Sequence, residues 1–318
     1  MAPFPNLRLP VIVAPMFLVS GVELTVAACQ AGLVGSFPAS NARDAAGLAS
    51  WLGQIREALA DDAAAAPFAV NINLQKGRYA DHDAMVAACE AARAPLVITS
   101  VGDPTEIVER VHGWGGQVFH DVTTVRHAEK AVEAGVDGLI LVCAGAGGHS
   151  GAASPFSLLP RVRRFFDRTL VLAGGVADGA GIAAARMLGA DLVYMGTRFI
   201  ASAESLAADD YKRMLIETDI SDVIYTPAIS GLPANFLRPS IAAAGMDPDA
   251  LPPLKGPRQA DLPEGVRAWK HVWSGGQAVG LIDDAPPVAV LVDRLEAEMR
   301  QAQAAFLAPA RRMAALPA

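Results

Sequence analysis

Short apolar runs recur along the chain, and segments with helical periodicity separate them. The runs are continuous rather than alternating, which is typical of strands buried on both faces of a parallel sheet. Successive runs start about 20 to 35 residues apart, the length of one strand–helix unit. The sequence predicts eight strands, at residues 11–16, 33–37, 68–74, 95–101, 117–122, 138–144, 170–175 and 192–196.

Apolar positions between these runs follow the period of an α-helix. A clear stripe extends from Leu48 to Leu59, and it predicts an amphipathic helix. Two later stripes end at Gly135 and Gly189, where glycine can adopt the left-handed conformation that ends a helix. Eight strand–helix units predict an α/β protein with a (β/α)₈ barrel. A doubly wound open sheet is disfavoured because no Gly-x-Gly-x-x-Gly follows the first strand.

The pattern changes after the eighth strand. Prolines are frequent between residues 227 and 263 and exclude a long helix there. We therefore predict a Pro-rich insertion at 218–275 that forms a cover or lid, and a barrel made of residues 1–217 and 276–318. Apolar positions from Val288 onward recur at helical spacing, which predicts a C-terminal helix that packs back on the barrel.

Composition narrows the functions that this barrel can have. The chain has 318 residues, 52% of them hydrophobic, and a formal net charge of −7. Nucleic acids and anionic membranes need a concentrated positive field, so we expect neither as a partner. No apolar run is long enough to span a membrane, and no signal peptide is recognised. The cysteines Cys29, Cys89 and Cys143 form no zinc or disulfide pattern. We expect a cytoplasmic protein without a metal.

Ligands of such barrels bind at the C-terminal ends of the strands. Gly174 and Gly175 follow the seventh strand, and Gly196 and Thr197 follow the eighth. Barrels commonly bind a phosphate there through backbone N–H groups, which glycine leaves accessible. The two segments therefore predict a phosphate site, with tight chain turning as the alternative.

One histidine is the candidate for proton transfer. His149 lies in the glycine-rich loop 145–151 after the sixth strand, where no apolar neighbour draws the ring into a core. A histidine near its ordinary pKa can act as an acid or a base at neutral pH. The alternative is a loop histidine that faces solvent. His120, at the end of an apolar run, is expected to lie hydrogen-bonded within the core.

Other catalytic motifs are absent from the sequence. It contains no Gly-x-Ser-x-Gly, no Gly-x-x-x-x-Gly-Lys and no His-Glu-x-x-His. One imidazole supplies only about 10²- to 10⁴-fold of rate enhancement. A phosphate site beside a single histidine therefore indicates chemistry carried by an organic cofactor.

An ordered set of motifs resembles the nitronate monooxygenase family, formerly called 2-nitropropane dioxygenases. The set is VIVAPM (11–16), FAVNINL (68–74), AGGHSG (146–151), LAGGVADG (172–179), GADLVYMGTRF (189–199) and WSGGQAVGLIDD (273–284). The resemblance covers most of the chain. It implies a TIM barrel that binds FMN non-covalently and uses O₂ to oxidise nitronates such as propionate 3-nitronate.

The resemblance also implies roles for individual residues. Ala14, Pro15 and Met16 would lie against the isoalloxazine ring, and Asn71 would hydrogen-bond the flavin. The FMN phosphate would be held by Gly174, Gly175, Gly196 and Thr197, and Gly148 belongs to the same cofactor-binding set. His149 matches the histidine of the family's active site, which acts as a base toward neutral nitroalkanes or orients the nitro group.

Two positions depart from the family's pattern. One class of the family reads Gln-Gly-x-Glu-Ala-Gly-Gly-His, whereas residues 142–146 are Val-Cys-Ala-Gly-Ala here, so the flavin-contacting glutamine and the acid are absent. Another branch has lysine after the histidine of the fifth strand, where this chain has Asp121. If Asp121 faces the ring, its negative charge disfavours an anionic reduced flavin.

Three functions remain open at this point. The first is an FMN-dependent nitronate monooxygenase that uses O₂ and needs no NAD(P)H. The second is an FMN-dependent reductase that uses NAD(P)H to reduce quinones or enoyl thioesters, because related flavin barrels resemble both kinds of reductase. The third is a barrel without flavin that binds a phosphorylated metabolite. Each acts on a small molecule.

Overall fold

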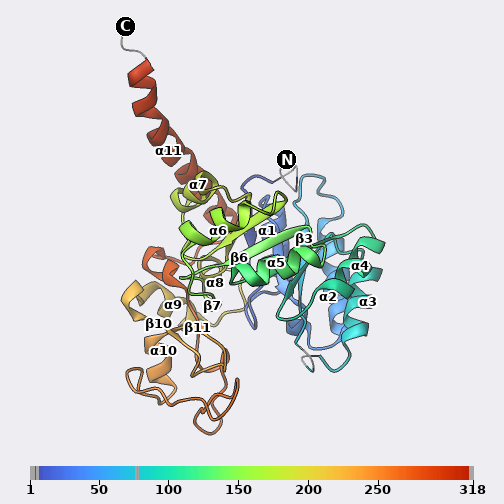
Figure 1. The fold of residues 1–318 in the computed structure, drawn as a ribbon, viewed down its shortest axis with the longest axis vertical. Coiled ribbons are helices and arrows are strands. Elements are labelled where there is room, and N and C mark those ends of the chain that lie inside the picture. Colours follow the sequence, from blue (N-terminus) through green and yellow to red (C-terminus); the bar gives the residue numbers. More distant parts are fainter. Residues whose placement is uncertain (1–3, 5–6, 76, 78, 315–318) are drawn as a thin grey trace.

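Eight parallel strands form a barrel at the centre of the protein (Figure 1). The computed structural model describes residues 4, 7–75, 77 and 79–314, with side chains to residue 308. The strands are β1 (Val11–Val13), β2 (Gly35–Pro38), β3 (Phe68–Asn73), β4 (Leu96–Ser100), β5 (Gln117–Val122), β6 (Gly138–Val142), β8 (Thr169–Ala173) and β9 (Leu192–Met195). Their order is β1-β9-β8-β6-β5-β4-β3-β2, and a bridge between Ile12 and Val34 closes the ring. All eight predicted strands are confirmed.

Helices alternate with these strands and cover the barrel. They are α1 (Val22–Gln30), α2 (Ala45–Leu59), α3 (His82–Ala91), α4 (Thr105–Gly113), α5 (Val125–Glu133), α6 (Pro155–Arg163), α7 (Gly179–Leu188) and the short α8 (Thr197–Ile200), with a 3₁₀ turn at Ala39–Ala42. Asp44, Asp81, Thr124 and Asp178 each cap a helix by accepting a backbone N–H bond in its first turn. Gly189 ends α7 at φ 105°, as predicted.

Alternation along the strands divides the apolar core into two layers. Odd or even positions of one strand face the barrel interior, and the others face the helices. Ala69, Ile98, Phe119, Ile140 and Leu192 pack together in the interior cluster. Their apolar neighbours in sequence pack in the cluster beneath the helices. The same parity directs the side chains that follow in each strand, at positions 71, 100, 121, 142 and 194, into the interior.

Between α8 and the C-terminal helix the chain adds a further set of elements. It contains α9 (Asp209–Glu217), a 3₁₀ turn at Ile220–Asp222, β10 (Val223–Thr226), β11 (Ala234–Leu237), α10 (Arg238–Ala243) and, after an irregular stretch, a 3₁₀ turn at Gln277–Leu281. A separate apolar cluster that includes Ile229, Phe236, Ile241 and Val272 stabilises the middle of this stretch, whereas α9 packs against Val19 and Ile200. The structure confirms an insertion after the eighth barrel strand. Its role as a lid stays a prediction.

The C-terminal helix α11 (Val288–Ala314) packs back on the barrel, as predicted. Its first turns bury Val288, Leu291 and Leu295, and they lie so close to α7 that a Cβ at Gly179 would clash with the carbonyl of Leu295. The later turns extend beyond the barrel (Figure 1), and Phe306 there is 63% exposed. Among the described residues, no helix is both long and apolar enough to cross a membrane.

Candidate active site

One cavity gathers every predicted site residue. It has a volume of about 1190 Å³ and lies at the C-terminal ends of the barrel strands. Its lining includes Ala14, Pro15, Met16, Asn71, Gly148, His149, Gly174, Gly175, Gly196 and Thr197. Single ligand pockets usually measure about 300 to 1,000 Å³. The cavity therefore has room for a cofactor and a substrate together.

The segment that follows β1 forms a fixed wall of this cavity. The Met16 N–H donates to Ser20 Oγ at 2.9 Å, and Asn41 Nδ2 donates to the Met16 carbonyl at 3.0 Å. The Ala14 N–H donates to the carbonyl of Met195 at 3.0 Å. These bonds hold an apolar surface in place, and such a surface suits the face of a flat ring.

The ends of β8 and β9 offer unpaired backbone donors to the same cavity. Gly175 has φ +72°, and no atom lies within 4 Å of the position that a Cβ would take. The N–H groups of Gly175, Gly196 and Thr197 donate to no acceptor among the described residues. Thr197 Oγ1 accepts the N–H of Gly276 at 3.0 Å, and its own proton remains free to donate. Open space beside unpaired N–H groups fits a phosphate.

His149 is held by a part of the chain that is distant in sequence. It lies on the two-residue strand β7 (Gly148–His149), which pairs antiparallel with β11 of the insertion. Its ring meets the indole of Trp269 edge to face, with centroids 5.1 Å apart. Trp269 has φ +69°, a strained conformation for a bulky residue that the surrounding contacts must stabilise. The insertion thus fixes the imidazole at the cavity.

A buried hydrogen-bond network ties the His149 loop to the insertion. Asn235 Nδ2 donates to the carbonyl of Ala146 at 2.7 Å and to Ser150 Oγ at 3.2 Å. The Gly148 N–H donates to Ser274 Oγ at 2.7 Å, and that hydroxyl donates to the Asn235 carbonyl at 2.6 Å. The loop is therefore preorganised by polar contacts, although it is rich in glycine.

We expect Asn235→Ala to lower the free energy of unfolding by about 1 to 3 kcal/mol, because the buried groups that Asn235 pairs lose their partner. Urea unfolding followed by circular dichroism measures this change. Gln54→Ala is the matched control, since Gln54 bonds only Ser50 on the exposed face of α2. Equal stability of both variants would contradict a structural role for the network.

Polar side chains line the interior end of the cavity. Asp121 on β5 and Tyr194 on β9 point inward by strand parity, and both line the cavity. Asp121 Oδ1 and Tyr194 Oη are buried and have no hydrogen-bond partner among the residues that the structure describes. Burial raises the pKa of Asp121 to about 7. The Asp121 carboxyl is thus largely neutral below pH 7. The negative charge that the sequence led us to expect at this position is present only above that pH.

His120 is confirmed as a core histidine. It is 6% exposed, and its Nδ1 lies 2.8 Å from Thr99 Oγ1. Burial first, and then His127, lower the pKa of His120 to about 4. The ring is therefore neutral at physiological pH and unsuited to exchange protons there.

The described part of the chain offers no cluster of metal ligands and no reactive thiol. No three His, Cys, Asp or Glu side chains converge there. Cys143 lies nearest the His149 loop in sequence, and burial raises its pKa to about 12. The three cysteines are buried and unpaired. A thiol that stays protonated is a poor nucleophile.

Sequence reasoning missed several residues of this site. Asn235 and Trp269 come from the insertion, where no local pattern marks them, and Ser274 lies in the motif WSGGQAVGLIDD (273–284), which gave no reason to expect a bond to the His149 loop. Tyr194 had a signal, because it lies two residues after the interior-facing Leu192 on the same strand.

The sequence of the chain is similar to those of known proteins along most of its length. The sequence model described as nitronate monooxygenase matches residues 2–298. The nitronate monooxygenase of Paraburkholderia phytofirmans is 28% identical, and the match covers 92% of each chain. The (3aS,4S,5R,7aS)-5-hydroxy-7a-methyl-1-oxo-octahydro-1H-indene-4-carboxyl-CoA dehydrogenase of Rhodococcus jostii is 26% identical over 73% of this chain and 77% of its own.

A solved structure has the same architecture. The nitroalkane oxidase of Streptomyces ansochromogenes superimposes with a TM-score of 0.76 at 25% identity, and the match covers 95% of this chain and 98% of that one. The family match extends over both the barrel and the insertion. The chain therefore belongs to the nitronate monooxygenase family and is a flavin-dependent oxidoreductase.

Proposed function

We propose that the protein binds FMN and oxidises nitronates of the propionate 3-nitronate type with O₂, with His149 as the acid or base of the site. One observation carries this proposal. A single cavity joins an apolar wall, a set of unpaired backbone N–H groups and an imidazole at the C-terminal end of the barrel. Flavin chemistry needs these three elements for the ring, the phosphate and the substrate.

The cofactor would be held by residues at the ends of several barrel strands. The phosphate would accept bonds from the amides of Gly174, Gly175, Gly196 and Thr197, and the ring would lie against Ala14, Pro15 and Met16. Asn71 Nδ2 already donates to the Ile98 carbonyl and to Ser100 Oγ, at 3.2 and 3.3 Å. Its Oδ1 is left to accept a bond from the ring. When bound, FMN supplies the group that accepts electrons from the substrate.

His149 would transfer the proton of the substrate, a step that the flavin itself does not carry out. A neutral nitroalkane must lose a proton from the carbon beside its nitro group, and the imidazole can accept that proton. A nitronate is already deprotonated, so the same ring would instead donate a hydrogen bond to a nitro oxygen. Gly148 has φ +71°, and no atom lies within 4 Å of its Cβ position. The substrate can thus approach the imidazole of His149 closely.

Oxygen uptake tests this function. Purified protein with bound FMN is expected to consume O₂ when propionate 3-nitronate is added, and to do so without NADH or NADPH. Uptake that appears only when a nicotinamide cofactor is present would contradict the proposal.

A second candidate is the reduction of enoyl thioesters or quinones by NAD(P)H. Two observations favour it. The loop before His149 lacks the glutamine and the acid of one monooxygenase class, and one relative is named as a dehydrogenase of a CoA thioester. Rapid loss of the flavin absorbance on addition of NADH or NADPH would identify this activity.

A further inference from the structure

The barrel interior below the cavity has an unusual composition. Four inward-facing side chains form what we call the polar floor, Asn71 on β3, Ser100 on β4, Asp121 on β5 and Tyr194 on β9. All four line the cavity. Asn71 and Ser100 bond each other at 3.3 Å, whereas Asp121 Oδ1 and Tyr194 Oη have no hydrogen-bond partner in the described part of the chain.

Unpaired polar atoms at such a place call for a ligand. A buried polar atom without a hydrogen bond costs about 1 to 3 kcal/mol, and native structures contain few of them. Asp121 and Tyr194 reach the same cavity from β5 and β9, which β6 and β8 separate in the sheet. Two polar atoms from different parts of the barrel wall therefore flank one space, and a flat polar ring can contact both.

The surroundings of Asp121 favour its neutral form. β6 and β8, which lie between β5 and β9, contribute Val142 and Ala173 to the cavity lining, and the remaining floor residues, Asn71 and Ser100, carry no charge. The one titratable group that faces Asp121 across the floor is Tyr194, and burial, followed by Asp121, raises the pKa of that phenol well above its ordinary value. A neutral acid is thus surrounded by neutral neighbours.

Charged and titratable groups occur farther out on the cavity wall. They are Asp103 after β4, His127, Lys130 and Glu133 on α5, His149 on β7, Tyr211 on α9, Tyr225 on β10 and Arg258 in the insertion, with His120 directed outward on β5 itself. Burial alone accounts for the raised pKa of Asp121. No cation near it holds the carboxylate in its charged form.

We propose that Asp121 and Tyr194 bind the heteroaromatic ring of the cofactor from the barrel interior, and that Asp121 does so as a neutral acid that donates its proton to a ring oxygen or nitrogen. This inference rests on the proposed binding of FMN. The isoalloxazine carries carbonyl oxygens and ring nitrogens that accept such bonds. An ionised Asp121 has no proton to donate and repels those acceptors. Protein in which Asp121 is ionised therefore binds the isoalloxazine ring poorly.

The test is the affinity of apoprotein for flavin at pH 6 and pH 8.5, measured by quenching of flavin fluorescence. If only the protonated form binds, the dissociation constant rises about 30-fold between these values for a pKa near 7. FMN and riboflavin are both used as probes, because riboflavin lacks the phosphate, which itself titrates with a pKa near 6. We expect this pH-dependent rise of the dissociation constant, called the step below, with both probes.

Variants assign the step to one carboxyl. Asp121→Asn keeps a hydrogen-bond donor at every pH, so its dissociation constant for flavin is expected to be the same at pH 6 and pH 8.5. The same is expected of Asp121→Ser, which has a smaller donor. Asp103→Asn is the matched control. Asp103 lines the same cavity, but its hydrogen bonds from Thr105 lower its pKa, and this variant keeps the step. Tyr194→Phe is expected to raise the dissociation constant about fivefold at both pH values.

The inference is overturned if wild-type affinity does not change with pH, if the step persists in both Asp121 variants, or if it occurs with FMN but not with riboflavin. Apoprotein that binds neither probe would overturn the cofactor proposal and this inference together. That outcome is distinct from FMN binding that is tight and independent of pH.

Discussion

Replacement of His149 by alanine is expected to lower kcat for a neutral nitroalkane by about 100-fold or more while FMN stays bound. A positioned acid or base contributes about 10²- to 10⁴-fold, and the side chain of His149 lies on β7 rather than at the unpaired amides of Gly175, Gly196 and Thr197. The preformed nitronate needs no proton removal. Its turnover is expected to fall by less than about tenfold, the loss of a single hydrogen bond.

Steady-state kinetics with 1-nitropropane and its nitronate separate these effects, and the flavin absorbance per protein reports occupancy. His82→Ala is the control, because His82 lies at the start of α3 and does not line the cavity. Equal losses with both substrates would show that His149 acts in binding or orientation alone. Unchanged turnover with both would remove it from the reaction.

A carboxylate at position 175 is expected to weaken FMN binding at least about 100-fold. Gly175 borders open space with φ +72°, a conformation that aspartate and asparagine tolerate better than most residues. Two unit charges about 4 Å apart repel by about 4 kcal/mol at the effective dielectric of a protein surface. The phosphate would therefore be expelled by Gly175→Asp.

Gly175→Asn separates charge from size, since it has nearly the same shape and no charge. Its dissociation constant for FMN is expected to remain within about tenfold of wild type. Titration of apoprotein with FMN measures both variants. Position 174 is less suitable, because a Cβ there would lie 2.8 Å from the carbonyl of Ala144 and would disturb the fold. Equal affinities of the Asp and Asn variants would place the phosphate elsewhere.

The sequence was sufficient to predict the barrel and the position of the cavity. Buried parallel strands leave continuous apolar runs, and the C-terminal ends of barrel strands meet on one face. Residues as distant as Ala14 and Thr197 could therefore be predicted to line one site. The two glycine-rich segments do line this cavity, and their role in holding a phosphate stays a prediction.

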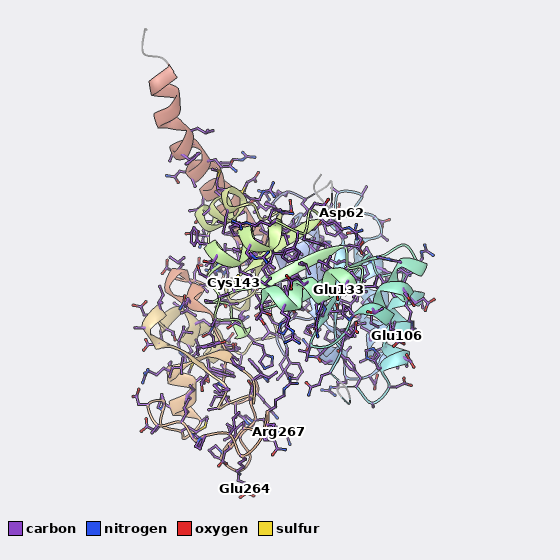
Figure 2. All side chains as sticks on the ribbon, in the orientation of Figure 1. Asp62, Glu106, Glu133, Cys143, Glu264 and Arg267 are labelled. Atoms are coloured by element: carbon purple, nitrogen blue, oxygen red, sulfur yellow. The ribbon has the colours of Figure 1, made fainter. Side chains whose placement is uncertain are left out.

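The contacts that hold His149 could not be predicted in the same way. β7 has only two residues, and it pairs with β11, in which Ala234 lies opposite His149. Trp269 reaches the same ring from a Pro-rich segment without periodicity. In that segment Glu264 lies at the lower end of the view, away from Glu106 on α4 and Glu133 on α5 (Figure 2). Contacts of long sequence separation and short strands leave no local signal.

The protonation of Asp121 also depends on the fold. Its sequence position indicated a charge beside the ring, but the apolar and neutral neighbours inside the barrel raise its pKa to about 7. Desolvation of a carboxyl depends on side chains from several strands. No single segment of the sequence reveals it.

The most direct test of the proposed function is an anaerobic titration of the purified, flavin-loaded protein with propionate 3-nitronate, followed by its visible spectrum. We expect the absorbance of the oxidised flavin to decrease without any nicotinamide and to return when O₂ is admitted. A spectrum that ignores the nitronate but is bleached by NADH or NADPH would contradict nitronate oxidation and identify the protein as a reductase.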